Sequence, residues 1–98
     1  MRVIARKTLR DFWEGGHADA EEPLIAWYKE AESAVWHGPN DIKMRYPSAS
    51  MISNDRVVFN IKGNTYRLIV AVKYQIKIVY IRFVGTHAEY DKINAREV

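Results

Sequence analysis

The spacing of the apolar residues changes near Ser50, and this change constrains the fold more than any other feature of the sequence. Before that point the apolar residues recur every three or four positions, as on one face of a helix. After it they alternate with other residues and are rich in Val and Ile, as strands are. This order predicts an α+β domain, with N-terminal helices packed on one face of an antiparallel β-meander.

Two main helices are expected before Ser50. Thr8 is the expected N-terminal cap of the first helix, and Asp19 that of the second, which Gly38-Pro39 ends. Residues 1–4 suit a short first strand, and Asn40-Asp41 suits the cap of one further helical turn. The apolar stripe of the second helix consists of Leu24, Trp27, Tyr28, Ala31, Ala34 and Val35.

Three strands are expected at residues 56–61, 65–72 and about 78–84. Residues 62–64 read as a hairpin loop, whereas residues 73–77 hold a reversal that no Gly or Pro locates. Because side chains alternate along a strand, each strand contributes to two faces of the sheet. The row expected in the core is Val57, Phe59, Ile61, Tyr66, Leu68, Val70, Val72, Val79, Ile81 and Phe83.

The opposite row mixes cations with apolar residues, and three neighbouring strands each place an arginine in it: Arg56, Arg67 and Arg82. Three guanidinium groups on one face repel each other unless an anion meets them. The sequence leaves two interpretations open. The arginines bind phosphate, or they pair with acids such as Glu89 and Asp91.

Charge is unevenly distributed along the chain. Residues 1–42 hold 5 basic and 8 acidic side chains, whereas residues 43–98 hold 10 basic and 4 acidic ones. Such an asymmetry favours a polyanionic partner such as nucleic acid, although exposed strands also carry Lys and Arg simply for solvation. The absence of Cys excludes disulfides, thiolate zinc sites and Cys nucleophiles.

The length and hydropathy of the chain predict one domain over residues 1–98, because 98 residues leave room for one core. No apolar run is long enough to span a membrane, and the N-terminus lacks the apolar segment of a secretory signal. We therefore expect a cytoplasmic protein with no membrane partner.

A short motif follows the last strand. Thr86 and Glu89 have the spacing of a capping box, which places His87 in the first turn of a short helix and Tyr90 one turn further on. Imidazole is the side chain whose charge changes near neutral pH, so His87 suits proton transfer, while an exposed residue beside a cap is the simpler interpretation. His17 is expected in a loop and His37 near the end of the second helix, and no His spacing is typical of a metal site.

Residues 79–91 and 56–68, read together, closely resemble the HigB-type toxins of bacterial type II toxin–antitoxin modules, which belong to the wider RelE-like group. The resemblance runs from Ala5 to about Ala95 and includes residues 7–10 and 46–49. It implies a microbial RNase-like fold and ribosome-dependent cleavage of mRNA. It also implies neutralisation by a HigA-like antitoxin with a helix-turn-helix domain, through which any contact with operator DNA is indirect.

Cleavage of this kind needs no metal or other cofactor. The ribose 2′-OH attacks the adjacent phosphorus, so the site needs a base, an acid for the leaving 5′-oxygen, and cations for the charged transition state. His87 is the expected acid or base, Arg67 and Arg82 the phosphate clamps, and Tyr90 an orienting or base-stacking residue. The cations expected to contact the backbone of mRNA or ribosomal RNA are Lys43, Arg45, Arg56, Lys62, Lys73 and Lys77.

Two other functions remain open at this point. In the first, the chain is a non-catalytic RNA-binding module, and His87 has only a structural place beside the cap. In the second, it binds only a protein, and its basic face matches an acidic segment of an antitoxin.

Overall fold

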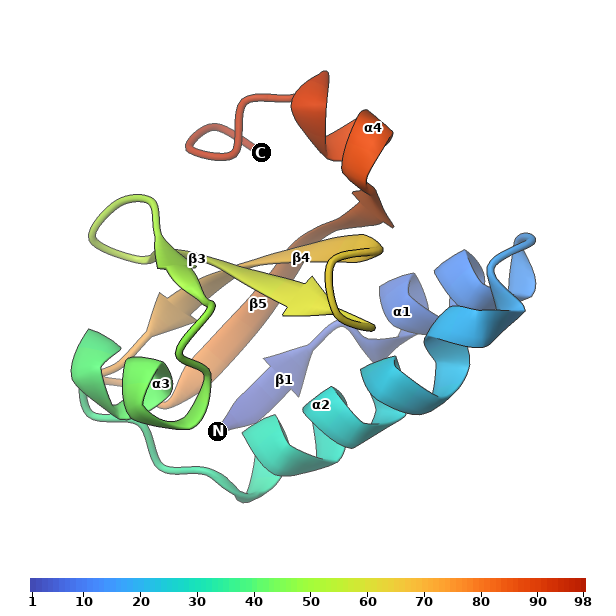
Figure 1. The fold of residues 1–98 in the computed structure, drawn as a ribbon. Helices are drawn as coiled ribbons and strands as arrows, with labels where there is room; N and C mark the ends of the chain where they lie inside the picture. The colour runs from blue at the N-terminus through green and yellow to red at the C-terminus, as the bar shows by residue number, and fades with distance from the viewer.

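The computed structural model describes all 98 residues, Met1–Val98 (Figure 1). It confirms the α+β class. The elements in chain order are β1 (Arg2–Ile4), α1 (Arg6–Glu14), the 3₁₀ turn η1 (Ala18–Ala20), α2 (Glu21–Ser33), α3 (Pro39–Arg45), β2 (Ser50–Met51), β3 (Arg56–Ile61), β4 (Tyr66–Lys73), β5 (Ile78–Thr86) and α4 (His87–Asp91).

The five strands form one sheet in the order β1-β5-β4-β3-β2. Strands β3, β4 and β5 make the predicted antiparallel meander, and β2 extends it through the pair Ser50↔Val58. At the other edge β1 runs parallel to β5, with Val3 opposite Val79. The sheet is therefore mixed. The chain passes through α1, α2 and the meander between the two parallel strands, β1 and β5.

Helices α1 and α2 cover one face of the sheet, as predicted (Figure 1). Leu9 and Trp13 of α1 and Leu24 and Trp27 of α2 are buried there. The Phe59 ring lies at the centre of this core, 5.4 Å from the Trp27 ring and 5.0 Å from the Tyr46 ring, measured between centroids. Aromatic side chains thus join α2, β3 and the segment after α3.

The expected helix boundaries need correction. Helix α1 begins at Arg6 without a side-chain cap, so Thr8 lies within it. Asp19 is part of η1, and its carboxylate instead accepts hydrogen bonds from Tyr66 and Lys62. The carboxylate oxygen atoms of Asp19 that would cap a helix therefore bind residues from another part of the chain.

The second helix is shorter than its apolar stripe indicates. It ends at Ser33, and Ala34 has an extended backbone. Val35, predicted to lie on the buried stripe, is 61% exposed. Ala34 still packs against the core from this extended segment, as does the buried Trp36 after it, so apolar residues continue past the end of the helix.

The opposite face of the sheet, called the outer face below, is covered by α4 and the chain after it (Figure 1). Val58, Ile69 and Ala71 on this face are buried, and none of them belongs to the main core cluster. A second, smaller apolar layer therefore lies on the outer face, which was expected to be only partly covered. The other helices were predicted on one face of the sheet, and α4 lies on the opposite, outer face.

A β-bulge interrupts the pairing of β4 with β5. Ile69 is opposite Phe83, but Val70 is opposite Ile81, so Arg82 is the extra residue. Beyond the bulge the alternation of β5 is reversed. The assignment of Phe83 to the core is therefore wrong: Phe83 lies on the outer face with Ile69, and Val84 packs toward the core.

No helix has both the length and the apolar character that crossing a membrane requires.

Candidate functional site

Three of the four predicted catalytic residues gather where β5 ends and α4 begins. Arg67 lies near the start of β4 and is opposite Gly85 of β5. His87 follows two residues later as the first residue of α4, and Tyr90 is one turn further along that helix. The antiparallel pairing of β4 with β5 thus brings Arg67 of β4 beside α4, which follows β5.

Arg67 contacts Tyr90 directly. Its guanidinium carbon lies 5.8 Å from the centroid of the Tyr90 ring, and its Nη1 donates to the carbonyl oxygen of Asn64 at 3.2 Å. Neither Arg67 nor Arg82 takes part in an ion pair. Pairing with Glu89 or Asp91, the alternative left open by the sequence, is not what the structure shows. Both guanidinium groups are free to meet a phosphate.

Arg82 stands apart from the other three residues. It is exposed at the bulge, and its guanidinium carbon lies 5.3 Å from the centroid of the Tyr80 ring, two residues earlier on the same strand. No hydrogen bond, ion pair or cation–π contact joins it to Arg67, His87 or Tyr90. Arg82 is three residues before Gly85, a rise of about 10 Å along the strand. In the free chain the two guanidinium groups therefore lie apart, each beside its own tyrosine.

The predicted capping box is confirmed and sets the orientation of α4. Oγ1 of Thr86 accepts from the backbone N–H of Glu89 at 3.1 Å, and Oε1 of Glu89 accepts from the backbone N–H of Thr86 at 2.8 Å. The hydrogen bond from Thr86 lowers the pKa of the Glu89 carboxyl. The cap leaves the His87 side chain half exposed, with Nδ1 3.2 Å from Oδ2 of Asp91.

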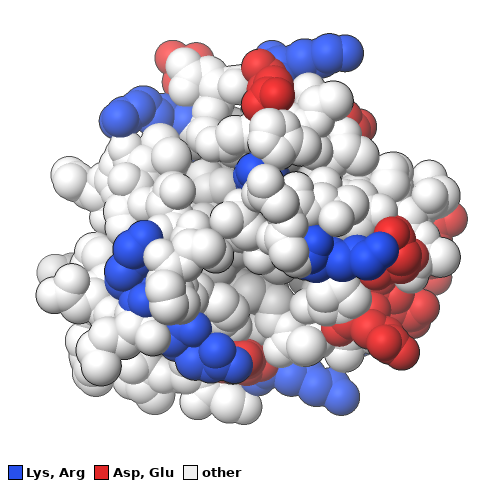
Figure 2. Space-filling model, in the orientation of Figure 1, with Lys and Arg blue, Asp and Glu red and all other residues white.

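The six cations expected to contact RNA are dispersed, and each has a partner within the chain. Lys62 pairs with Asp19 at 2.6 Å, and Arg45 donates to Glu30 at 2.9 Å. Lys43 donates to the carbonyl oxygen of Ala49, and Lys77 lies 3.3 Å from His37. Figure 2 shows basic side chains in separate groups, with acidic side chains gathered beside the connection between α1 and α2.

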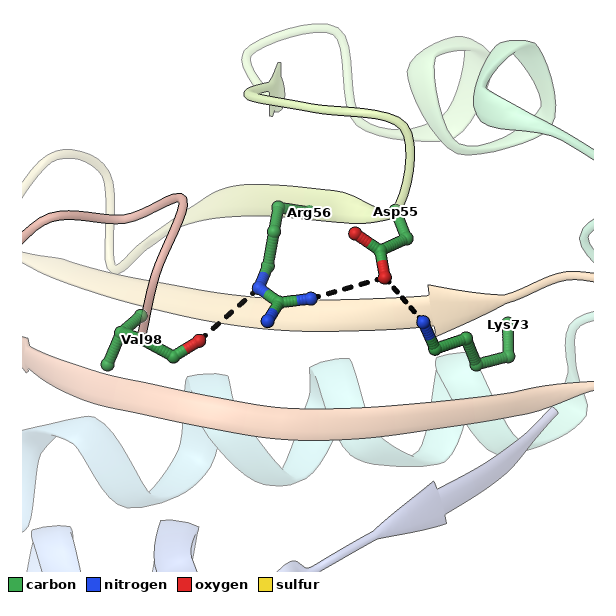
Figure 3. A network of polar contacts seen from close by, with 4 residues as sticks. All are labelled: Asp55, Arg56, Lys73 and Val98. Atoms are coloured by element: carbon green, nitrogen blue, oxygen red, sulfur yellow. Dashed lines mark hydrogen bonds and ion pairs between the residues drawn. The ribbon is translucent and has the colours of Figure 1, made fainter.

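Arg56 and Lys73 share Asp55 as a partner (Figure 3). The Asp55 carboxylate is 3.2 Å from Arg56 and 2.5 Å from Lys73, and Arg56 also donates to the backbone oxygen of Val98 at 3.3 Å. The Arg56 side chain is only 16% exposed. This network joins β3, β4 and the end of the chain, so Arg56 has a structural contact where an RNA contact was predicted.

Comparison with known proteins places these residues in a family. The family model described as HigB_toxin, RelE-like toxic component of a toxin-antitoxin system, matches residues 20–93. The mRNA interferase toxin HigB of Escherichia coli (strain K12) is 30% identical over 97% of this chain and 92% of its own length. The proteins named mRNA interferase HigB of Escherichia coli O157:H7 and Shigella flexneri match to the same extent. The chain belongs to the HigB toxin family.

In this HigB-family chain an open hollow of about 480 Å³ adjoins the contact between Arg67 and Tyr90. Tyr90, Ile52 and the segment 93–96 line it. Tyr90 therefore has the Arg67 guanidinium near its ring and free volume beside it, an arrangement in which a planar base has room beside an aromatic side chain.

Sequence reasoning missed two features of this site. Tyr80 lies near Arg82, and the shared alternation of positions 80 and 82 was the available signal. His17, interpreted as a loop residue, stacks on Phe12 and lies edge-on to Tyr66 near the start of α4. No local motif marks His17, because its partners come from other elements. Nowhere does the HigB-family chain bring three His, Asp or Glu side chains together as metal ligands.

Proposed function

We propose that this chain, whose relatives are named mRNA interferases, is the toxin of a type II toxin–antitoxin pair and an endoribonuclease that cleaves mRNA on the ribosome. The observation that carries the proposal is the Arg67 guanidinium, which has no carboxylate partner and lies 5.8 Å from the centroid of Tyr90 beside the first turn of α4. A cation, an aromatic ring and an imidazole there match the demands of RNA cleavage.

The proposed reaction begins with the ribose 2′-oxygen, which attacks the adjacent phosphorus while its proton passes to a base. The bond from phosphorus to the 5′-oxygen breaks, and the leaving oxygen receives a proton from an acid. His87 serves as acid or base, with Asp91 at 3.2 Å to orient its ring. Arg67 and Arg82 stabilise the charge on the phosphoryl oxygens, and Tyr90 stacks on a base.

Ribosome dependence is proposed because the site is open. The His87 side chain is 51% exposed, and Arg82 is exposed as well. A surface site of this kind does not by itself hold a flexible RNA in the geometry of in-line attack, whereas a ribosome that fixes the mRNA supplies that alignment. Metal independence is proposed because the two carboxylates at the site, Glu89 and Asp91, contact Thr86 and His87, and no third carboxylate or imidazole completes a set of metal ligands with them.

The proposed partner is a HigA-like helix-turn-helix antitoxin in the same cytoplasm, with operator DNA contacted through it. We propose that an acidic antitoxin segment covers the face of Arg67, Arg82 and His87, because the two arginines lack acidic partners within the chain. The alternative is an antitoxin bound elsewhere that blocks access to the ribosome.

The test compares three conditions with one preparation of the isolated chain. Messenger RNA is supplied free, on ribosomes with an empty decoding site, and on translating ribosomes, with magnesium held at the level that keeps ribosomes intact. We expect cleavage only on translating ribosomes, and growth arrest on induction that a co-expressed neighbouring reading frame relieves. Rapid cleavage of free mRNA refutes ribosome dependence, and no cleavage under any condition refutes the nuclease proposal.

A second candidate function is the non-catalytic module that binds RNA or antitoxin. One observation favours it: His87 is the only histidine of α4 and of the strands beside it, so the site shows one imidazole where the reaction needs both an acid and a base. This candidate predicts that His87→Ala leaves ribosome binding and growth arrest intact.

A further inference from the structure

We propose that His17, in the connection between α1 and η1, is a positioning residue for α4. It lies outside the predicted site, and its imidazole supports the cap from which His87 and Tyr90 project. The inference rests on the proposed function only in taking those two residues as the ones that meet RNA. It concerns how a very short helix is held in place.

Three contacts fix the His17 ring. It stacks on the Phe12 ring with centroids 4.1 Å apart and planes 6° from parallel, and it meets the Tyr66 ring edge-on at 5.7 Å. Its Nδ1 lies 3.3 Å from the carbonyl oxygen of Phe12. Because a carbonyl only accepts, Nδ1 carries the proton, and Nε2 is left for other partners.

The Tyr66 side of this cluster leads directly to α4. Tyr66 is opposite Thr86 in the pairing of β4 with β5, and Thr86 is the N-cap of α4. Tyr66 is itself held by Asp19, whose carboxylate accepts from the Tyr66 hydroxyl at 2.5 Å and from Lys62 at 2.6 Å. His17 therefore packs on a tyrosine whose place is fixed beside the cap.

Glu89 is the second link. Its carboxylate closes the capping box, and the backbone hydrogen bond from Thr86 is the main cause of the lowered pKa of that carboxyl, with smaller contributions from the nearby His17 and Lys92. The charged groups near His17 thus come from α4 as Glu89 and from η1 as Asp19.

Helix α4 depends on such support because it has little of its own. It spans five residues, none of which is buried. Isolated helices of this length are unstable in water, so its position comes from its cap and from contacts such as that of Tyr90 with Arg67. Loosening the cap moves both His87 and Tyr90, although neither touches His17.

The first test measures α4 in the free protein. His17→Phe keeps an aromatic ring on Phe12 but removes the Nδ1–H that faces the Phe12 carbonyl. We expect the carbon chemical shifts of residues 87–91 to move toward unfolded values, with amide exchange of Glu89 faster by about 3- to 10-fold, the usual effect of a weakened cap. His37→Phe, in a loop beside Lys77, is the matched control and should leave these signals unchanged.

The second test measures single-turnover cleavage on translating ribosomes. His17→Phe should lower the rate at saturation more than it raises the half-saturating concentration, because a displaced His87 affects the chemical step while Tyr90 is only one of the RNA contacts. Glu89→Gln should reduce the cleavage rate less in the His17→Phe variant than in the wild type, because both substitutions act through the cap of α4.

The outcomes separate the inference from the proposed function. If the wild-type chain cleaves no RNA, the proposed function is wrong. The chemical shifts and amide exchange of α4 still test the role of His17 in that case. Unchanged α4 signals in a folded His17→Phe variant overturn the inference. If that variant does not fold, Phe12→Leu, which removes the stacking partner and retains His17, should give the same change in α4, and unaltered signals there overturn it equally.

Discussion

The guanidinium carbon of Arg67 lies 5.8 Å from the centroid of the Tyr90 ring, so one cation–π contact joins the central strand β4 to the exposed helix α4. Arg67 has no acidic partner, and Tyr90 borders an open hollow. The contact places a cation beside an aromatic ring that borders the hollow, and the predictions for both residues depend on it.

The ring of Tyr90, rather than its hydroxyl, should matter. Tyr90→Phe keeps the surface beside Arg67 and should cleave at nearly the wild-type rate. Tyr90→Ala removes both the cation–π contact and the stacking surface, and should slow cleavage about 10-fold or more, given about 1–3 kcal/mol for stacking of a base. Single-turnover rates on translating ribosomes provide the measurement. Equal defects in the two variants would show that the hydroxyl is the active group.

Lysine should not replace either arginine. Arg67→Lys and Arg82→Lys keep the charge but lose the planar fork that grips two phosphoryl oxygens, so each should abolish growth arrest. Thermal unfolding should change little for Arg82→Lys, because Arg82 is exposed. Arg10→Lys on the exposed side of α1 is the matched control and should remain toxic. If both site variants remain fully toxic, Arg67 and Arg82 contribute only their positive charge and not the geometry of the guanidinium group.

His87→Ala should slow cleavage by about 10² to 10⁴, the usual cost of losing a general acid or base. The helix should survive the change, because Thr86 and Glu89 form the cap without the imidazole. Ribosome binding should therefore remain, as measured by co-sedimentation. An unchanged rate would remove His87 from the mechanism and favour the non-catalytic module.

Asp55 should stabilise the fold in a pH-dependent way. The hydrogen bond from Lys73 lowers the pKa of Asp55 below its ordinary value of 3.8. A carboxyl with a lowered folded-state pKa stabilises the protein above its unfolded pKa, and this stability is lost as the pH falls through the folded value. Asp55→Asn should therefore reduce the free energy of unfolding by about 1 kcal/mol or less at pH 7, since the pair is partly exposed.

Urea unfolding at neutral pH and below pH 4 measures this difference, which should shrink in acid. Asp11→Asn removes a more exposed ion pair, with Lys7, and should have a smaller effect at either pH. A difference for Asp55→Asn that stays constant with pH would assign the effect to hydrogen bonding rather than to charge.

Gly85→Ala should disturb the site through Phe83. A Cβ at position 85 would lie 2.5 Å from the Phe83 ring and 3.1 Å from Oε1 of Glu89. Crowding of this kind costs about 1–3 kcal/mol in unfolding free energy. Phe83→Leu should recover part of that loss in the double variant, as chemical denaturation would show. Simple additivity of the two changes would mean that the ring does not cause the strain.

The sequence predicted those parts of the structure that depend on residues close together in the chain. The capping box of Thr86 and Glu89 and the alternation of β3 and β4 are such parts, because each partner lies within a few positions. The candidate site followed from these local patterns and from the resemblance to HigB toxins.

The sequence-based predictions were wrong or incomplete where contacts between residues far apart in the chain determine the structure. Phe83 was assigned to the core because alternation was carried through a bulge that no residue type marks. The carboxylate of Asp19 was expected to cap a helix, yet Tyr66 and Lys62 take it from more than forty positions away. The partners of His17 come from α1 and β4, so no spacing rule reveals them.

The parallel pairing of β1 with β5 governs how the protein is made. Val3 is synthesised long before Val79, its partner across the sheet. The edge of the sheet cannot close until the last strand has been synthesised, and Arg82 and His87 arrive with or after that strand. A nascent chain that stops short of β5 therefore holds neither a finished sheet nor an assembled site.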